Sequence, residues 1–362
     1  MLNCRKCILD LKPYVPGKPI EEVKRELGID DIIKLASNEN PFGASPRAVE
    51  ALKCAAECVA LYPDGSCFEL RNAMAAHLGV PPEMLVFGAG GDEVIFHLAM
   101  AFVEPGSEII QADPTFSEYG AASKIMDANI ISVPLKNCAH DLPAMLDKVS
   151  SRTRLFVISN PNNPTGTIVQ ADEVERVIDK LPEQCVLLLD EAYYEYVDDP
   201  AYTRSIEWAF QGRNVLVLRT FSKIYGLAGL RIGYGIAPSR IIEALERVRM
   251  PFNVNSMAQA AAIASLSDPD QVTKSREQNK RSKEYFYAHL DSLGIGYAPT
   301  QANFIWIDTA RDSQWVFSEL LKRGVIVRTG DIFGCPTHIR VTTGTDAQNE
   351  RFIATLAEVL GK

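Results

Sequence analysis

The stretch Leu155–Tyr193, LFVISNPNNPTGTIVQADEVERVIDKLPEQCVLLLDEAY, decides the fold class of this 362-residue chain. Residues 155–159 and 185–189 are mostly apolar runs without alternation, which is typical of strands buried on both faces of a sheet. Between them lie an Asn- and Pro-rich loop at 160–166 and an expected helix at 171–180. A strand, a crossover helix and a second strand predict a parallel α/β unit.

The same alternation continues on both sides of this stretch. Further strands are expected at 85–87, 107–112, 130–133, 215–218 and 233–236, with helices at about 91–102, 114–125 and 142–148. Seven such strands predict an α/β fold with a mostly parallel seven-stranded sheet. In sheets of this kind, ligands bind beyond the carboxyl ends of the strands.

A second, smaller α+β domain is expected after this block. A helix at 238–249 and a helical region at 255–290 lead to strands at 303–308, 325–328 and 338–341 and helices at 314–323 and 347–360. We expect a large domain at 41–255 and a small domain at 256–362. The N-terminal segment 1–40, with a short helix at 20–27, should pack with the small domain and a partner subunit.

Composition excludes several classes of protein. Apolar residues make up 47% and charged residues 23%, which is ordinary for a globular protein, and the net charge is −9. An acidic chain repels phosphate backbones and anionic lipid, so neither nucleic acid nor a membrane is an expected partner. No run of 18 apolar residues exists, and residues 1–16 lack the apolar core of a signal peptide, so we expect a cytoplasmic protein.

The chain holds eight cysteines, which without an export signal are expected to be free thiols in a reducing compartment. The alternative is a zinc site at the cysteine pairs Cys4/Cys7 and Cys54/Cys58. We expect the second pair simply to pack on a helix at 46–60. The prediction is therefore that no metal is bound.

Two of four chemistry-bearing motifs lie in loops that follow expected strands. In Gly88–Glu93, glycines let backbone amides approach a ligand and the next helix favours an anion, although a plain tight turn is the alternative. It lacks the context of a dinucleotide fingerprint and the Lys of a P-loop. In Asn160–Gly166, Asn160 should sit at the sheet edge with its amide free to donate; the alternative is a rigid loop.

The other two motifs carry charge. Asp190 ends a fully apolar strand, which is costly unless it meets a cation or a protonated nitrogen, and Tyr193 could face the same site; the alternative is a helix N-cap. Lys223 follows another apolar strand, where a lysine near other cations can lose its proton and attack a carbonyl carbon. Thr220, Ser222 and Arg231 beside it suit a phosphate. A solvated surface lysine is the alternative for Lys223 alone.

Together these groups are more specific than any one of them. A nucleophilic lysine, a phosphate cradle, an aspartate for a protonated ring nitrogen, and an asparagine and a tyrosine for a phenolic oxygen match pyridoxal 5′-phosphate. The sequence therefore predicts one site for this cofactor.

At this point the chain resembles the fold type I, class II aminotransferases, and within them the histidinol-phosphate branch. The resemblance runs nearly end to end. It rests on Pro13–Lys18, Leu35–Pro41, Tyr62–Gly65, Gly90–Glu93, Asp113–Phe116, Asn160–Gly166, Asp190–Tyr193, Ser222–Lys223, Leu230–Gly233 and Ile339–Thr342.

The resemblance implies a role for each cofactor-binding position. Lys223 would bind the cofactor covalently and then move a proton, and Asp190 would pair with the ring nitrogen. Asn160 and Tyr193 would bond the phenolic oxygen, and Phe116, where many relatives carry tyrosine, would stack on the ring. Residues Gly91, Asp92, Thr220, Ser222 and Arg231 would hold the phosphate, together with Tyr62 reaching over from the other subunit of a homodimer.

The resemblance also implies the substrates. Arg340 and Arg328 would bind the anionic end of the substrate, with Tyr14 and Asn40 in the substrate pocket. The reaction would be a ping-pong exchange in histidine biosynthesis, in which L-histidinol phosphate and 2-oxoglutarate give imidazole-acetol phosphate and L-glutamate.

Three alternatives stay open at this point. One is an aminotransferase of the same branch that acts mainly on aromatic amino acids, and another is a decarboxylase of a phosphorylated amino acid. The third is a non-catalytic relative that binds an effector, against which Lys223 and Asp190 argue.

Overall fold

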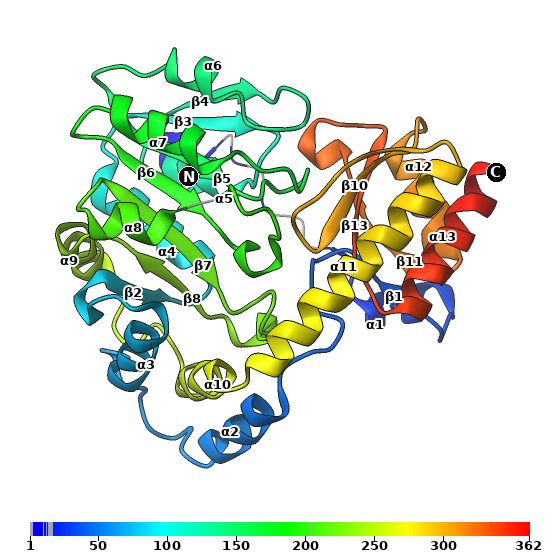
Figure 1. Cartoon of the computed structure of the whole chain (residues 1–362), viewed down its shortest axis with the longest axis horizontal. Helices are drawn as coiled ribbons and strands as arrows, with labels where there is room; N and C mark the ends of the chain where they lie inside the picture. The colour runs from blue at the N-terminus through cyan, green and yellow to red at the C-terminus, as the bar shows by residue number, and fades with distance from the viewer. Residues whose placement is uncertain (1–2, 10, 12, 14–16, 203) are drawn as a thin grey trace.

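The structure is a computed structural model and describes residues 3–9, 11, 13, 17–202 and 204–362. Figure 1 shows a larger part built on a wide sheet and a smaller part beside it. The long helix α11 (Pro269–Ser292) extends from one part to the other. The division into domains at residues 40 and 255 stays a prediction.

The large sheet has the strand order β2-β8-β7-β6-β5-β3-β4. Strand β8 runs in the opposite direction to the other six strands of this sheet, which are all parallel to one another. The predicted α/β fold with a mostly parallel seven-stranded sheet is therefore confirmed. The strands are β2 (Leu85–Gly88), β3 (Glu108–Asp113), β4 (Asn129–Pro134), β5 (Thr153–Ser159), β6 (Val186–Asp190), β7 (Val215–Thr220) and β8 (Gly233–Ile236).

Strand register brings the ends of the central strands to one edge. Ser159, the last residue of β5, pairs with Asp190, the last residue of β6, and Asp190 in turn pairs with Leu218 of β7. The segments that follow these three strands therefore leave the sheet side by side. This is why motifs far apart in the sequence meet.

Helices cover both faces of the sheet because its strands alternate between two apolar cores. Leu187 and Leu189 of β6 join the core that holds α7, whereas Leu188 joins the core that holds α4. Each buried leucine contributes about 1.5–3 kcal/mol. One face carries α4 (Gly91–Phe102), α5 (Glu118–Ile125) and α9 (Ser239–Val248); the other carries α6 (Leu142–Leu146), α7 (Ala171–Lys180) and α8 (Ser205–Phe210).

The smaller part is an antiparallel sheet of order β12-β13-β10-β9 with helices against it. The N-terminal helix α1 (Ile20–Leu27) lies beside it, where Val23 packs against Ile326, and β1 (Ile33–Lys34) pairs in parallel with β11 (Val325–Ile326). Its other elements are β9 (Gly296–Ala298), β10 (Phe304–Asp308), α12 (Ser313–Lys322), β12 (Arg328–Thr329), β13 (His338–Thr342) and α13 (Asp346–Leu360).

Two expected helices begin or divide elsewhere. The helical region at 255–290 is two helices, α10 (Ser256–Leu266) and α11, because Pro269 has no N–H to continue α10 and instead opens α11. The helix expected from residue 114 begins at Glu118, because the Thr115 hydroxyl bonds the Asn162 side chain at 2.8 Å and holds the preceding residues in a loop.

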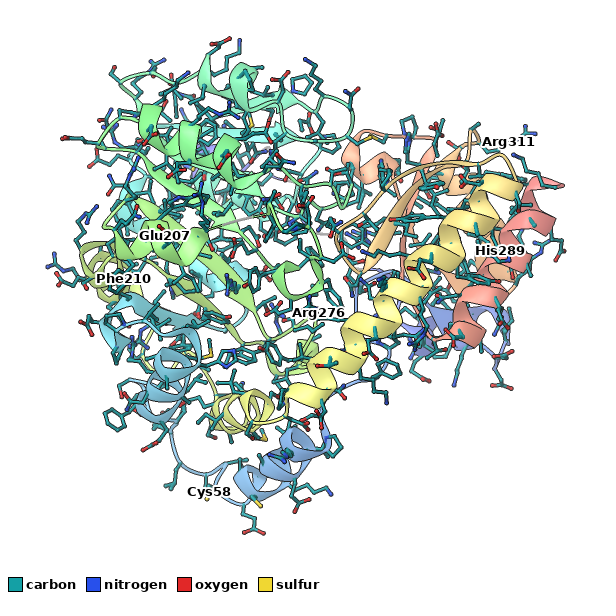
Figure 2. The ribbon with its side chains drawn as sticks, viewed as in Figure 1. Cys58, Glu207, Phe210, Arg276, His289 and Arg311 are labelled. Atoms are coloured by element: carbon teal, nitrogen blue, oxygen red, sulfur yellow. The ribbon has the colours of Figure 1, made fainter. Side chains whose placement is uncertain are left out.

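Two further expectations were wrong in extent. The strand expected at 325–328 is β11 and β12, which pair with different strands. The helix expected at 46–60 is α2 (Pro46–Ala56), which packs on α10 together with α3 (Phe68–Leu78). Cys54 and Cys58 are exposed rather than packed, and Cys58 lies at the outer margin of the molecule (Figure 2).

The described ranges contain neither a candidate membrane span nor a candidate metal site. Within them, no helix combines the length and apolar character needed to cross a bilayer. Nor do three or more His, Cys, Asp or Glu side chains of this portion gather closely enough to hold a metal ion.

Candidate active site

A cavity of about 280 Å³ opens at the strand edge where β5, β6 and β7 end. The residues that line it come from the start of α4, the loop after β7, the N-terminal segment 36–39 and strands β12 and β13. Both parts of the molecule therefore contribute to one cavity. Its charged and polar lining includes Ser37, Asn38, Glu39, Asp92, Tyr119, Asn163, Asp190, Tyr193, Arg219, Thr220, Ser222, Lys223, Arg231, Arg328 and Arg340.

Lys223 projects into this cavity from the loop that follows β7. Its ammonium nitrogen Nζ donates to the carbonyl of Ser37 at 3.2 Å. Burial, together with the nearby guanidinium of Arg340, lowers the pKa of Lys223 to about 8. A larger share of this amine is therefore neutral near pH 7 than for a surface lysine, which is the form that attacks a carbonyl carbon.

Asp190 is a buried carboxylate at the tip of β6. Its Oδ2 accepts from the Tyr119 hydroxyl at 2.5 Å, and its Oδ1 accepts from the amide of Ala192 at 2.9 Å. Burial raises the pKa of Asp190 to about 6, although both hydrogen bonds oppose the rise. No cationic side chain of the described residues pairs with it, so a protonated nitrogen on a ligand would complete the site.

The start of α4 forms an anion-binding corner with Arg231. Gly90 has φ +88°, and a Cβ built there would lie 2.3 Å from Nη2 of Arg231. Only glycine lets the guanidinium come so close to the free amides at the helix N-terminus. Arg231 donates to Asp92 at 2.9 Å.

Two hydroxyls complete this corner. Thr220 Oγ1 accepts from the amide of Ser222 at 3.0 Å and donates to the carbonyl of Ile232. Both side chains are buried and line the cavity. Helix amides, hydroxyls and an arginine together make a set that suits a phosphate.

Three aromatic rings line the same cavity, those of Phe116, Tyr119 and Tyr193. The Tyr193 hydroxyl accepts from Nδ2 of Asn38 at 2.8 Å, and its ring packs edge-on against Phe304. Phe116 lies edge-on to Tyr119, with 5.6 Å between ring centroids. The cavity can therefore hold a flat ring with polar substituents.

Arg340 and Arg328 bring positive charge from the small part. They face each other in the register of β13 and β12. Arg340 is buried and donates to the Asn163 side chain and, at 2.7 Å, to the carbonyl of Ala36. Two guanidinium groups at one side of the cavity suit a carboxylate or a phosphate.

The structure does not support the expected position of Asn160. Its amide is fully buried, donates to the carbonyl of Val169 at 3.0 Å and accepts from the amide of Val169 at 2.9 Å. The expectation of a free donor at the cavity was therefore wrong, because this side chain closes its own loop. Asn163, three residues later, lines the cavity instead.

Asn40 is also outside the cavity lining. Its Nδ2 donates to the carbonyl of Ile224 at 2.6 Å and to Ser275 at 2.9 Å. The expectation that it contacts substrate is not supported, because its amide is used to hold the backbone next to Lys223.

Tyr62 does not line the described cavity of its own chain. Tyr62 is 83% exposed and stacks on Phe252, with 4.8 Å between ring centroids. Tyr14 lies outside the described residues.

Sequence reasoning missed several residues of the cavity wall. Ser37 and Asn38 do not follow any strand that the sequence predicted, and Tyr119 lies within a helix, so the rule that ligands bind at strand ends did not point to them. Two sequence signals existed: Asn163 is one of three asparagines in an already suspected loop, and Ser37 and Asn38 lie in the stretch Leu35–Pro41 on which the resemblance rests.

Comparison with known proteins agrees with this geometry. Residues 30–356 match the family model for aminotransferase class I and II. The chain is 55% identical to a histidinol-phosphate aminotransferase of Moorella thermoacetica, over 99% of this chain and 93% of that protein. It is 49% identical to the protein of the same name from Caldicellulosiruptor saccharolyticus, over 98% and 99% of the two chains.

A solved structure is similar over the whole chain. It is histidinol-phosphate aminotransferase from Sinorhizobium meliloti in complex with pyridoxal-5′-phosphate, with a TM-score of 0.92 and 28% identity. The similarity covers 100% of this chain and 98% of that one.

Proposed function

The chain belongs to the class I and II aminotransferases, and we propose that it is a histidinol-phosphate aminotransferase of histidine biosynthesis. It would exchange the amino group between L-histidinol phosphate and 2-oxoglutarate with pyridoxal 5′-phosphate as cofactor. The observation that carries this proposal is Lys223, an amine of lowered pKa in a cavity with a buried carboxylate and an anion-binding corner.

The residues present fit the cofactor. Asp190 is a buried carboxylate that lacks a cation among the described residues, as a partner for a protonated ring nitrogen should. The phosphate would lie at Gly91, Asp92, Thr220, Ser222 and Arg231.

The remaining contacts to the cofactor concern its ring. Tyr193 would hold the phenolic oxygen together with Asn163, which replaces Asn160 in this role, and Phe116 would cover the ring face. When bound, the cofactor acts as an electron sink that acidifies the substrate carbon carrying the amino group.

Lys223 would carry the acid–base work. Its Nζ can accept a proton from that substrate carbon and return it later in the exchange, since a pKa near 8 suits both directions close to neutral pH. Ser37 accepts a hydrogen bond from Nζ and so restrains where the amine points.

Arg340 and Arg328 would select anionic substrates. A guanidinium binds a phosphate monoester or a carboxylate in the same two-pronged way, so one pair can serve both histidinol phosphate and 2-oxoglutarate. Buried Arg340 has an orientation set by Ala36 and Asn163, which would position the anion relative to Lys223.

We further propose a cytoplasmic homodimer in which Tyr62 reaches the partner's cofactor phosphate. The Tyr62 side chain is 83% exposed, so its ring is available to contact a second chain. Nearby apolar side chains are also exposed, namely Val59, Leu61, Phe68, Met250 and Phe252.

Steady-state rates test the proposal. We expect purified holoenzyme with 2-oxoglutarate to turn over histidinol phosphate with a higher kcat/KM than phenylalanine. A higher value for phenylalanine would instead support the aromatic aminotransferase, and carbon dioxide release would support the decarboxylase.

The Lys223→Ala variant separates these enzymes from a non-catalytic relative. We expect it to lose about 10³-fold or more in rate and to lose borohydride-trapped cofactor mass, because the acid–base and the covalent anchor go together. Lys53→Ala, at an exposed lysine paired with Glu50, is the control. An unchanged rate in Lys223→Ala would reject the proposal.

A further inference from the structure

Tyr119 is a buried tyrosine that none of the sequence motifs assigned to the site. It comes from α5, on one face of the sheet, and its hydroxyl meets Oδ2 of Asp190 at 2.5 Å. Its side chain is 1% exposed yet borders the cavity. The Tyr119 hydroxyl therefore contacts the buried carboxylate of Asp190 rather than solvent.

The direction of this hydrogen bond is set by chemistry. Burial raises the pKa of Tyr119 well above its ordinary value, and the charge of Asp190 raises it further, so the phenol keeps its proton at working pH. A phenol that keeps its proton donates, and an ionised carboxylate accepts. The bond thus stabilises the charged form of Asp190 against the cost of burial.

Geometry also fixes the carboxylate plane. Tyr119 holds Oδ2 from α5, and the amide of Ala192 holds Oδ1 at 2.9 Å from the segment after β6. With one donor on each oxygen, the carboxylate cannot rotate freely about its last side-chain bond. Its remaining lone pairs are left for a ligand in the cavity.

We propose that Tyr119 is a positioning residue that keeps the Asp190 carboxylate ionised and oriented for a protonated ring nitrogen. This inference rests on the proposed function. It adds that ring chemistry at Asp190 depends on a donor in α5, 71 residues away in the sequence. Tyr119 also packs edge-on against Phe116, the residue expected to cover the face of the cofactor ring. The position of Phe116 therefore depends on Tyr119 as well.

Other titratable groups near Asp190 act differently. Asp92 of α4 and the neighbouring Glu191 repel its negative charge and favour the protonated form. The negative charge of Asp190 also contributes to the raised pKa of Tyr202, but the Tyr202 hydroxyl donates to the carbonyl of Asn160 and not to Asp190. Lys223 and Arg231 face the same cavity from the loop after β7. Removal of Tyr119 alone should therefore shift the Asp190 equilibrium toward the protonated form.

An infrared titration of the apoprotein tests this without cofactor. The Asp190 carboxyl is assigned by isotope-labelled aspartate and by difference against Asp190→Asn. We expect a midpoint near pH 6 in the wild type and a rise of about one pH unit in Tyr119→Phe. Tyr225→Phe, at a buried tyrosine outside the cavity lining, should leave the midpoint unchanged.

A second variant guards against a purely structural effect. Incorporation of 3,5-difluorotyrosine at position 119 makes the phenol a stronger donor at nearly constant shape. We expect the midpoint to move down, opposite to Tyr119→Phe. Equal midpoints in all three proteins, or shifts of the same sign, would overturn the inference.

Cofactor titration completes the test. In Tyr119→Phe we expect pyridoxal phosphate affinity to fall about twofold at pH 7 and nearly tenfold at pH 5, with recovery at higher pH, since binding follows the ionised fraction of Asp190 and the midpoint rises by about one pH unit. If the wild type binds no cofactor, the proposed function fails, while the apoprotein titration still decides the role of Tyr119. Wild-type affinity in Tyr119→Phe across pH 5–8 would contradict the inference.

Discussion

At the scale of single residues, the site works by moving protonation equilibria in opposite directions. Burial lowers the pKa of Lys223 to about 8 and raises that of Asp190 to about 6, because burial disfavours the charged form of each group, which is the protonated form of the amine and the deprotonated form of the carboxyl. Between these two values the amine is partly neutral and the carboxylate is mostly ionised. That window contains neutral pH, where Asp190 is mostly ionised and about one tenth of Lys223 is neutral.

The first prediction concerns the pH dependence of cofactor capture by apoprotein. The neutral fraction of Lys223 should fall about tenfold per pH unit below 8, so the capture rate should rise with pH and level off above about pH 9. Since Arg340 lowers this pKa, Arg340→Gln should move the inflection to higher pH. Stopped-flow absorbance measures the rates.

The control for this experiment is Arg311→Gln. Arg311 is exposed and lies at the far end of the small part (Figure 2). It should keep the wild-type inflection. An inflection that does not move in Arg340→Gln would show that Arg340 does not act on the lysine.

The second prediction uses two glycines at positive φ, Gly90 and Gly79. Gly90→Ala places a Cβ 2.3 Å from Arg231, whereas Gly79→Ala, also at positive φ, meets nothing within 4 Å. Gly79→Ala should lose about 1 kcal/mol of stability from strain in the left-handed helical region, and Gly90→Ala should lose more, because its φ of +88° with ψ of 170° is essentially restricted to glycine. Only Gly90→Ala should also weaken phosphate-dependent cofactor affinity, by about tenfold, because a charge-assisted contact is displaced. Equal affinities in the two variants would contradict this.

At the scale of elements, the loop after β5 shows how one segment divides structural and site roles. Asn160 bonds both backbone groups of Val169, while Asn163 reaches Arg340. The two asparagines are three residues apart and face different surroundings. Sequence composition alone does not distinguish them.

The third prediction separates these roles. Asn160→Ala leaves the Val169 amide and carbonyl without partners in a buried site, so we expect a loss of about 2–4 kcal/mol in the free energy of unfolding. Asn163→Ala should lose less stability but more cofactor affinity. Urea denaturation and cofactor titration measure the two quantities. The reverse pattern would return Asn160 to the ring contact that the resemblance implied.

Much of the element scale was predictable. All seven strands of the large sheet were expected close to where they lie, because long apolar runs bounded by Gly, Pro and Asn are local signals. Errors occurred where a side chain from elsewhere intervened, as when Asn162 holds Thr115 and delays the start of α5.

At the scale of the whole molecule, the cavity depends on both parts. Lys223 and Asp190 come from the large sheet edge, whereas Arg328 and Arg340 come from the small sheet. The segment 36–39 lies between them, with Asn38 bonded to Tyr193 and to Thr342 of β13. Any movement of one part relative to the other would change the distance between the anion-binding arginines and the lysine.

The fourth prediction tests whether a partner subunit completes the site. Lys223→Ala and Tyr62→Ala dimers should each be nearly inactive. Mixed by reversible denaturation, they should recover about one quarter of wild-type activity, because half of randomly paired dimers carry one intact site of two. If Tyr62 acts in its own subunit, or plays no role, the mixture should show no such recovery.

The amino-acid sequence was sufficient to predict the order of strands and helices, the positions of Lys223 and Asp190 at strand ends, and the chemistry of the groups around them. These follow from apolar spacing and turn residues, which act over short stretches of chain. Tertiary structure alone decided that Asn163 rather than Asn160 faces the cavity, that Asn40 supports the backbone beside Lys223, and that Tyr119 meets Asp190. Those outcomes depend on strand register and on the packing of distant helices, where a shift of one residue turns a side chain to the other face.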